Sequence, residues 1–127
     1  MKKTIVISMM FLLIAGMAYA KDYEVKKKAG KYAVEVKIDK NPLVVGDNDA
    51  IIGITDASGR DVVNAKVELY YLMPSMPSMN YSEDARLEGN RYKSTIKPTM
   101  GGEWSLDVKF TVPGEKLHKV TFSFKAK

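Results

Sequence analysis

The sequence predicts an all-β domain, an immunoglobulin-like antiparallel β-sandwich of about seven strands. Short stretches of alternating apolar and polar residues recur along the chain, and Gly, Pro, Asn and Asp separate them. After residue 20, no stretch repeats its apolar residues with the period of a helix. The Cys–Trp–Cys pattern of antibody domains is missing, because the 127-residue chain has no cysteine.

Eight stretches carry the strand signal, although the first alternates weakly and the fifth is short. They are residues 22–28, 32–39, 49–55, 62–72, 81–87, 91–96, 103–112 and 117–124. The clearest alternation places Tyr32, Val34, Val36 and Ile38 on one face, and Trp104, Leu106, Val108 and Phe110 on another. The stretch 62–72 is the longest predicted strand, with Val63, Ala65, Val67, Leu69 and Tyr71 on one face. It runs directly into a methionine-rich segment.

The first 20 residues have the pattern of a secretory signal peptide. Lys2 and Lys3 precede an apolar run, which ends at an A-x-A cleavage site, Ala18-Tyr19-Ala20. The run is shorter than the ~20 residues that span a bilayer. We therefore expect cleavage after Ala20, a domain over residues 21–127 without a stable membrane anchor, and a periplasmic or secreted protein.

Composition argues against several functional classes. The formal net charge is +5, but the basic residues are scattered and form no stripe for nucleic acid. The lack of cysteine removes disulfides, thiolate metal ligands and cysteine nucleophiles. His118 is the single histidine, and no histidine–carboxylate–nucleophile set can be assembled around it. We expect a binding protein and not an enzyme.

The most unusual segment is Met73-Pro74-Ser75-Met76-Pro77-Ser78-Met79. Its three methionines have a period of three residues, which is the period of a polyproline II helix. Proline also favours tight turns, so the sequence leaves an extended and a bent shape open. Met100 and the only tryptophan, Trp104, form a second short segment that could lie at the same end of a sandwich.

Three interpretations of these methionines remain open. Thioethers are soft ligands that select Cu(I), so a copper site is the first, with Trp104 beside the ion. The second is an exposed surface that docks a partner, and the third is packing alone, because methionine fills gaps and contacts aromatic rings. The candidate metal ligands are Met73, Met76, Met79 and Met100, and the candidate metal-adjacent or partner-binding residues are Trp104, Tyr71 and Tyr81. His118 shares a face with Val120 and Phe122, which favours a structural role over a fourth ligand.

A set of ordered motifs resembles the YtkA-like domain family, small bacterial exported or membrane-anchored β-sandwiches. The motifs are Val45-Gly46-Asp47-Asn48, Asp56-Ala57-Ser58-Gly59, Met73-Pro74-x-Met76-Pro77, Gly89-x-x-Tyr92 and Thr99-Met100-Gly101-Gly102-x-Trp104. The resemblance covers roughly residues 43–112, and the sequence is similar, more distantly, to the periplasmic part of FixH-type proteins. The resemblance implies a role in copper handling, with an envelope metal-efflux or oxidase-assembly protein as partner. It matches Met73, Met76, Met100 and Trp104, and Met79 extends the run.

Overall fold

Eight strands make up the part of the chain that the computed structural model describes, residues 22–127. They are β1 (Tyr23–Ala29), β2 (Tyr32–Ile38), β3 (Asn48–Thr55), β4 (Lys66–Met73), β5 (Met76–Glu88), β6 (Arg91–Ile96), β7 (Gly102–Thr111) and β8 (His118–Ala126). All pairings between these strands are antiparallel, and this range contains no helix, so the predicted all-β class is confirmed. Nothing between residues 22 and 127 could therefore cross a membrane as a helix. The predicted signal peptide, residues 1–20, lies outside the described residues.

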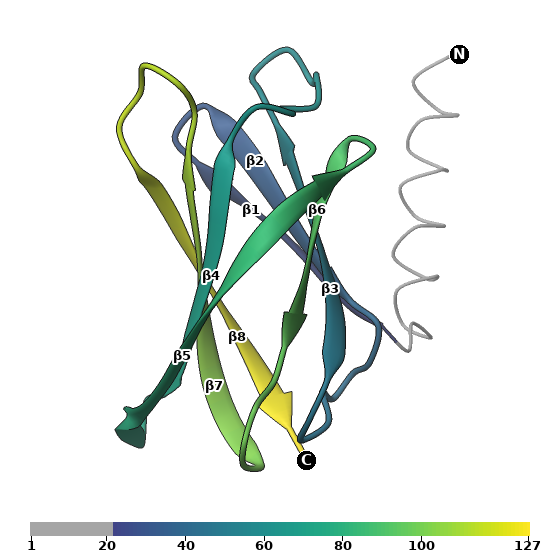
Figure 1. The fold of residues 1–127 in the computed structure, drawn as a ribbon, viewed down its shortest axis with the longest axis vertical. Helices are drawn as coiled ribbons and strands as arrows, with labels where there is room; N and C mark the ends of the chain where they lie inside the picture. Colours follow the sequence, from purple (N-terminus) through teal and green to yellow (C-terminus); the bar gives the residue numbers. More distant parts are fainter. Residues whose placement is uncertain (1–21) are drawn as a thin grey trace, which may run out of the picture.

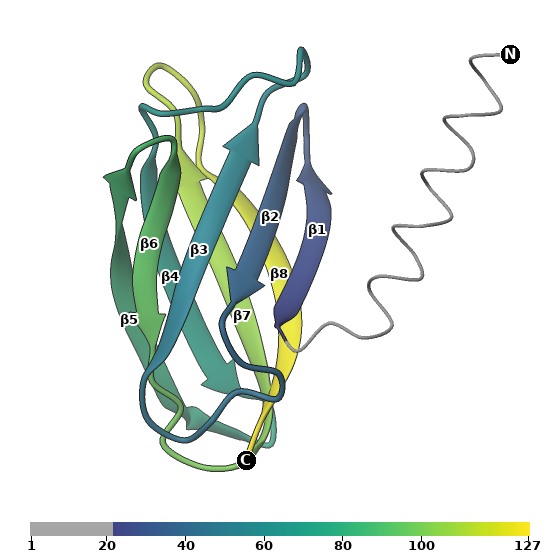
Figure 2. The same cartoon turned by 90° about the vertical axis from the view of Figure 1, so that its right-hand side faces the viewer.

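The strands form two layers that β5 joins (Figures 1 and 2). Hydrogen bonding follows the order β1-β2-β3-β6-β5-β4-β7-β8. One layer holds β1, β2, β3 and β6, and the other holds β4, β7 and β8. From β2 onward, this is the immunoglobulin order, A-B-E-D in one sheet and C-F-G in the other. β1 is an additional edge strand outside this order, and it corresponds to the weakly alternating stretch 22–28 of the sequence.

β5 is the longest strand, with 13 residues, and the prediction of a short strand over 81–87 was wrong about its start. It pairs with β4 through Asn80–Ala85 and with β6 through Arg86–Glu88. It therefore leaves one layer and enters the other, as its diagonal course in Figure 1 shows. None of its side chains is fully buried. Its half-buried face holds Tyr81 and Ala85 but also the charged Glu83, so apolar and polar residues do not alternate strictly and the sequence signal was weak there.

β4 begins later than predicted, so the expectation that 62–72 is the longest strand was wrong. Residues 62–65, which precede β4, belong to the connection between the two layers and are not part of a regular strand. The amide of Val62 donates to the carbonyl of Ile54 at 2.8 Å, and the Tyr92 hydroxyl donates to the carbonyl of Val62 at 2.8 Å. Val62 is buried and Val63 is 47% exposed, the reverse of the predicted faces. The predicted alternation holds within β4, where Val67, Leu69 and Tyr71 are buried.

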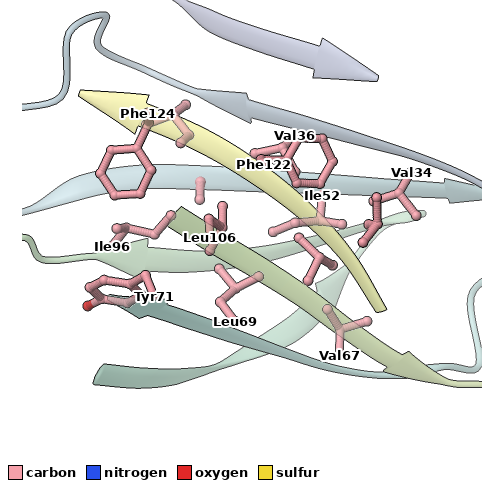
Figure 3. Packing of buried hydrophobic residues seen from close by; sticks show 14 of the residues in the cluster. Val34, Val36, Ile52, Val67, Leu69, Tyr71, Ile96, Leu106, Phe122 and Phe124 are labelled. Atoms are coloured by element: carbon pink, nitrogen blue, oxygen red, sulfur yellow. The ribbon is translucent and has the colours of Figure 1, made fainter. Parts of the chain in front are cut away.

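The core lies between the two layers, and its side chains point toward one another in Figure 3. One layer contributes residues such as Val34, Val36, Ile52 and Ile96. The other contributes Val67, Leu69, Tyr71, Leu106, Phe122 and Phe124. The predicted faces are confirmed for Val34 and Val36, for Val67, Leu69 and Tyr71, and for Leu106, whereas Ile52 lies in a nearly continuous apolar strand. Burying a side chain of this size stabilises the fold by roughly 1.5–3 kcal/mol.

Asn48 is the one fully buried polar side chain among the described residues. Its Oδ1 accepts a hydrogen bond from the amide of Val44 at 2.9 Å. Its Nδ2 lies 2.9, 3.0 and 3.1 Å from the carbonyls of Val44, Gly46 and Ile96, respectively. Gly46 also donates from its amide to the carbonyl of Pro98 at 3.0 Å. Asn48 and Gly46 thus connect the β2–β3 loop to the end of β6 and to the β6–β7 loop.

A polar cluster around Glu115 closes the end of the sandwich where β7 meets β8. The Tyr32 hydroxyl donates to Glu115 Oε2 at 2.6 Å, Lys31 Nζ lies 3.4 Å from the same oxygen, and His118 Nε2 lies 3.4 Å from Oε1. The hydrogen bond from Tyr32 lowers the pKa of Glu115. The same bond is the main cause that raises the pKa of Tyr32 to about 12.

The Tyr32–Glu115 bond predicts a loss of stability at both extremes of pH. The pKa of Tyr32 is higher in the folded protein than in the unfolded chain, so its contribution is complete below about pH 10 and disappears as the pH rises to about 12. The pKa of Glu115 is lower in the folded protein, so its contribution disappears as the pH falls through that lowered value. Urea denaturation of the wild type and of Tyr32→Phe across pH tests this: the difference between them should shrink at both ends. A constant difference would contradict it.

Candidate methionine site

The methionine-rich segment folds as a tight hairpin between β4 and β5. Met73 pairs with Met76, and Pro74 and Ser75 form the two-residue turn between them. Of the two shapes that the sequence left open, the structure contains the bent one. The hairpin forms the lower tip of the molecule on the left of Figure 1, and the β6–β7 loop lies at the same end. The two methionine segments therefore lie at one end of the sandwich, an arrangement that the sequence left possible.

A bulge follows the hairpin and sets the position of Met79. The pairing register shifts between Leu72, which pairs with Asn80, and the next residue along β4. Residues 77–79 are therefore additional residues on β5. The Asn80 side-chain amide stabilises this bulge, with Nδ2 at 3.0 Å and 3.3 Å from the carbonyls of residues 77 and 78.

The four methionines differ strongly in exposure. Met73 is 5% exposed, and its Cε would lie only 2.9 Å from a Cβ built at Gly102, so its side chain packs under the β6–β7 loop. Met76 and Met100 are 42% and 38% exposed. Met79 is half-buried against the core. The period of three therefore does not place the methionines of the segment on one face, because the turn and the bulge rotate them differently.

The sulfur of Met79 lies against two hydroxyl groups. Thr99 Oγ1 is 3.3 Å from Met79 Sδ, and the Tyr81 hydroxyl is 3.7 Å from it. The two hydroxyl oxygens are themselves 2.9 Å apart. Since Thr99 precedes Met100 in the chain, this contact brings the backbone of Met100 close to Met79. These groups connect β5 to the β6–β7 loop.

Trp104 lies beneath this connection and is 1% exposed. Its ring stacks on Phe124 with centroids 6.2 Å apart, and the rings of Tyr71 and Tyr81 lie 5.9 Å and 6.2 Å from it. Its Nε1 donates to the carbonyl of Met100 at 3.1 Å. The indole thus supports the β6–β7 loop from the core. Because of this hydrogen bond, Trp104 fluorescence should respond to a change at Met100.

Tyr71 has a structural position, since its side chain is completely buried. Its hydroxyl accepts a hydrogen bond from the amide of Lys97 at 2.9 Å and donates to Glu83 Oε2 at 3.0 Å. Burial is the main cause that raises the pKa of this phenol. Tyr71 therefore connects β4 to β5 and to the start of the β6–β7 loop.

His118 lies far from the methionines. It pairs with Phe110 across β7 and β8, six residues along β7 from Trp104. At about 3.3 Å per residue, this separates the two positions by about 20 Å. The imidazole stacks on Phe110 with centroids 5.1 Å apart and contacts the ring edge of Tyr32. The structure therefore supports the structural role that the sequence favoured for His118.

Sequence reasoning missed Thr99 as a residue of this site. It stands next to Met100 in one of the motifs quoted above, but a lone threonine in a loop carries no signal of its own. Thr99 and Met79 are 20 residues apart in the sequence, and only the fold brings them into contact. The described part of the chain shows no second candidate metal site built from harder ligands. Within residues 22–127, no group of three or more His, Cys, Asp or Glu side chains is arranged to hold a metal ion.

Comparison with known proteins gives one result. Neither the curated proteins nor the solved structures yielded a match. The family model described as YtkA-like matches residues 26–109. This range covers all of β2 to β6, most of β1 and β7, both methionine-bearing segments and Asn48. The chain therefore belongs to the YtkA-like family.

Proposed function

We propose that this protein is an exported accessory protein of the bacterial cell envelope that binds Cu(I) through its methionine end, and that it has no enzymatic activity. The observation that supports this is the meeting of the β4–β5 hairpin with the β6–β7 loop, where Thr99 Oγ1 lies 3.3 Å from Met79 Sδ. All four methionines of residues 22–127 belong to these two segments. Thioethers are the soft ligands that Cu(I) prefers.

The exposures suggest different roles for the four thioethers. Met76, Met79 and Met100 are exposed or half-buried, so an ion can approach them from solvent. Met73 is buried under Gly102, and its sulfur would join the site only if its side chain moved from that position. Tyr81 lies beside Met79, whereas Trp104 and Tyr71 support the loops from the core.

A second candidate function rests on the exposure of Met76 and Met100, which are 42% and 38% exposed. Flexible methionine side chains at a surface adapt to partner proteins. The hairpin tip would then dock an envelope metal-efflux or oxidase-assembly protein without binding a metal itself. Leucine distinguishes the two candidates, because it removes the thioethers and keeps the apolar surface, whereas serine removes both.

Replacement of Met73, Met76, Met79 and Met100 together by leucine tests the copper site. Leucine keeps most of the volume and costs less than about 1.5 kcal/mol per site, so the fold should persist while every thioether is lost. In the absence of oxygen, we expect the wild type to take Cu(I) from a chromophoric chelator, with a change in Trp104 fluorescence. The variant should leave the Cu(I) on the chelator.

The proposed export is tested separately. The intact mass of the protein from a periplasmic extract should show that it begins at Lys21.

The matched control is Leu117→Ala, which removes an exposed apolar side chain at the opposite end and should leave Cu(I) binding unchanged. Equal copper uptake by the wild type and the quadruple variant would exclude the methionine site. If neither protein binds copper, but Met76→Ser with Met100→Ser abolishes binding of a purified envelope partner, the docking function is correct.

A further inference from the structure

Met79 is the only methionine among the described residues whose sulfur has hydrogen-bonding partners. Thr99 Oγ1 and the Tyr81 hydroxyl lie 3.3 Å and 3.7 Å from it. Tyr81 is itself fixed, because its ring contacts the rings of Tyr71 and Trp104 at centroid distances of 5.7 Å and 6.2 Å. A long and flexible side chain is thus held at its sulfur by two groups from different segments.

The number of protons limits what these hydroxyls can do to the sulfur. Each hydroxyl carries one proton, and the two oxygens lie 2.9 Å apart, where one donates to the other. While that bond is made, only one proton remains for Met79 Sδ. A thioether sulfur has two lone pairs, so one stays free to coordinate a soft cation while the other accepts the hydroxyl proton. The contact therefore orients the sulfur and leaves it able to bind.

We propose that Thr99 and Tyr81 are positioning residues that hold Met79 as the preorganised first ligand of the soft-metal site, to which Met76 and Met100 then close. This inference rests on the function proposed above. A methionine with three rotatable bonds loses conformational freedom when it becomes a ligand, and that loss opposes binding. At Met79, the hydroxyl contact already restricts the side chain in the metal-free protein, so less conformational freedom is lost when the ion binds. Met76 and Met100, which are exposed, have no such contact.

Thr99→Val tests the inference, because valine has nearly the same shape and lacks the hydroxyl. The probe is Ag(I), a soft cation that does not change oxidation state during the titration. The methionine methyl resonances of the full protein report binding at each site by NMR. We expect the Ag(I) affinity measured at the Met79 methyl to fall about three- to tenfold, which corresponds to the cost of ordering one flexible side chain. Thr99→Ser keeps the hydroxyl and should restore an affinity close to that of the wild type.

Two further variants control for effects on the fold. Thr121→Val removes another exposed hydroxyl, which donates to Asp107 Oδ1 on β7, and should not change Ag(I) binding. Tyr81→Phe removes the second hydroxyl and keeps the ring on Trp104, so it should weaken binding less than Thr99→Val, because its oxygen is farther from the sulfur. The melting temperatures of all variants should stay close to that of the wild type.

The outcomes separate the inference from the function on which it rests. If the wild type binds Ag(I) and Thr99→Val binds it equally well, the positioning role is wrong and the methionine site remains. If Ag(I) moves none of the methionine methyl resonances of the wild type, the site itself is wrong, and the positioning role is wrong with it. If Thr99→Ser binds as weakly as Thr99→Val, the threonine shape and not its hydroxyl sets the affinity, which also overturns the inference.

Discussion

Trp104→Ala is expected to destabilise the protein by about 3–5 kcal/mol, as is usual for truncation of a fully buried aromatic residue. The indole is 1% exposed and contacts Phe124, Tyr71 and Tyr81. Its removal leaves a large cavity under the β6–β7 loop and also deletes the hydrogen bond to the carbonyl of Met100. Urea denaturation followed by circular dichroism measures the change.

Phe110→Ala is the matched control for Trp104→Ala. Phe110 is equally buried on the same strand, but lies at the opposite end beside His118. Both variants should lose a similar amount of stability. At a temperature where both remain folded, only Trp104→Ala should weaken soft-metal binding, because only Trp104 supports Met100. Equal binding by the two variants would show that the β6–β7 loop keeps its position without the indole.

Asn48→Ala is expected to reduce the free energy of unfolding by about 2–4 kcal/mol. The substitution removes the side-chain donor to the buried carbonyl of Ile96 and leaves the β2–β3 loop held only by its backbone bonds, such as that from Gly46 to Pro98. The groups of Val44 and Gly46 lie nearer to solvent and can bind water, which keeps the cost below the sum of all lost bonds. Asn48→Asp has the same size but buries a charge in place of a donor, and should be no more stable than Asn48→Ala.

Asn80→Ala is the control for Asn48→Ala, because it removes an asparagine side chain from an exposed position. The Asn80 amide also donates to two backbone carbonyls, but the residue is exposed, so water can replace it. We expect a loss of less than about 1 kcal/mol. A similar loss at positions 48 and 80 would contradict the interpretation that burial makes Asn48 important.

The motifs that suggested the family have different physical explanations in the structure. Asn48 joins two loops from a buried position. Gly102 has a φ of +133°, a conformation that glycine adopts readily, and leaves room for Met73. Tyr92 spans the gap before β4 and binds the carbonyl of Val62. Only the motifs with Met73, Met76 and Met100 contain groups for the proposed chemistry.

By itself, the sequence determined the all-β class and the inward faces of β2, β4, β7 and β8, and it singled out the two methionine segments. These features depend on local alternation and on turn residues, which are visible along the chain. Only the tertiary structure decided the course of β5, the late start of β4 and the unequal exposure of the methionines. The half-buried face of β5 mixes the charged Glu83 with apolar residues, and the segment before β4 is not a regular strand, so neither produces a clean alternation. The hydroxyls at Met79 and the four-bond role of Asn48 arise from residues distant in the chain, which meet only when the layers close.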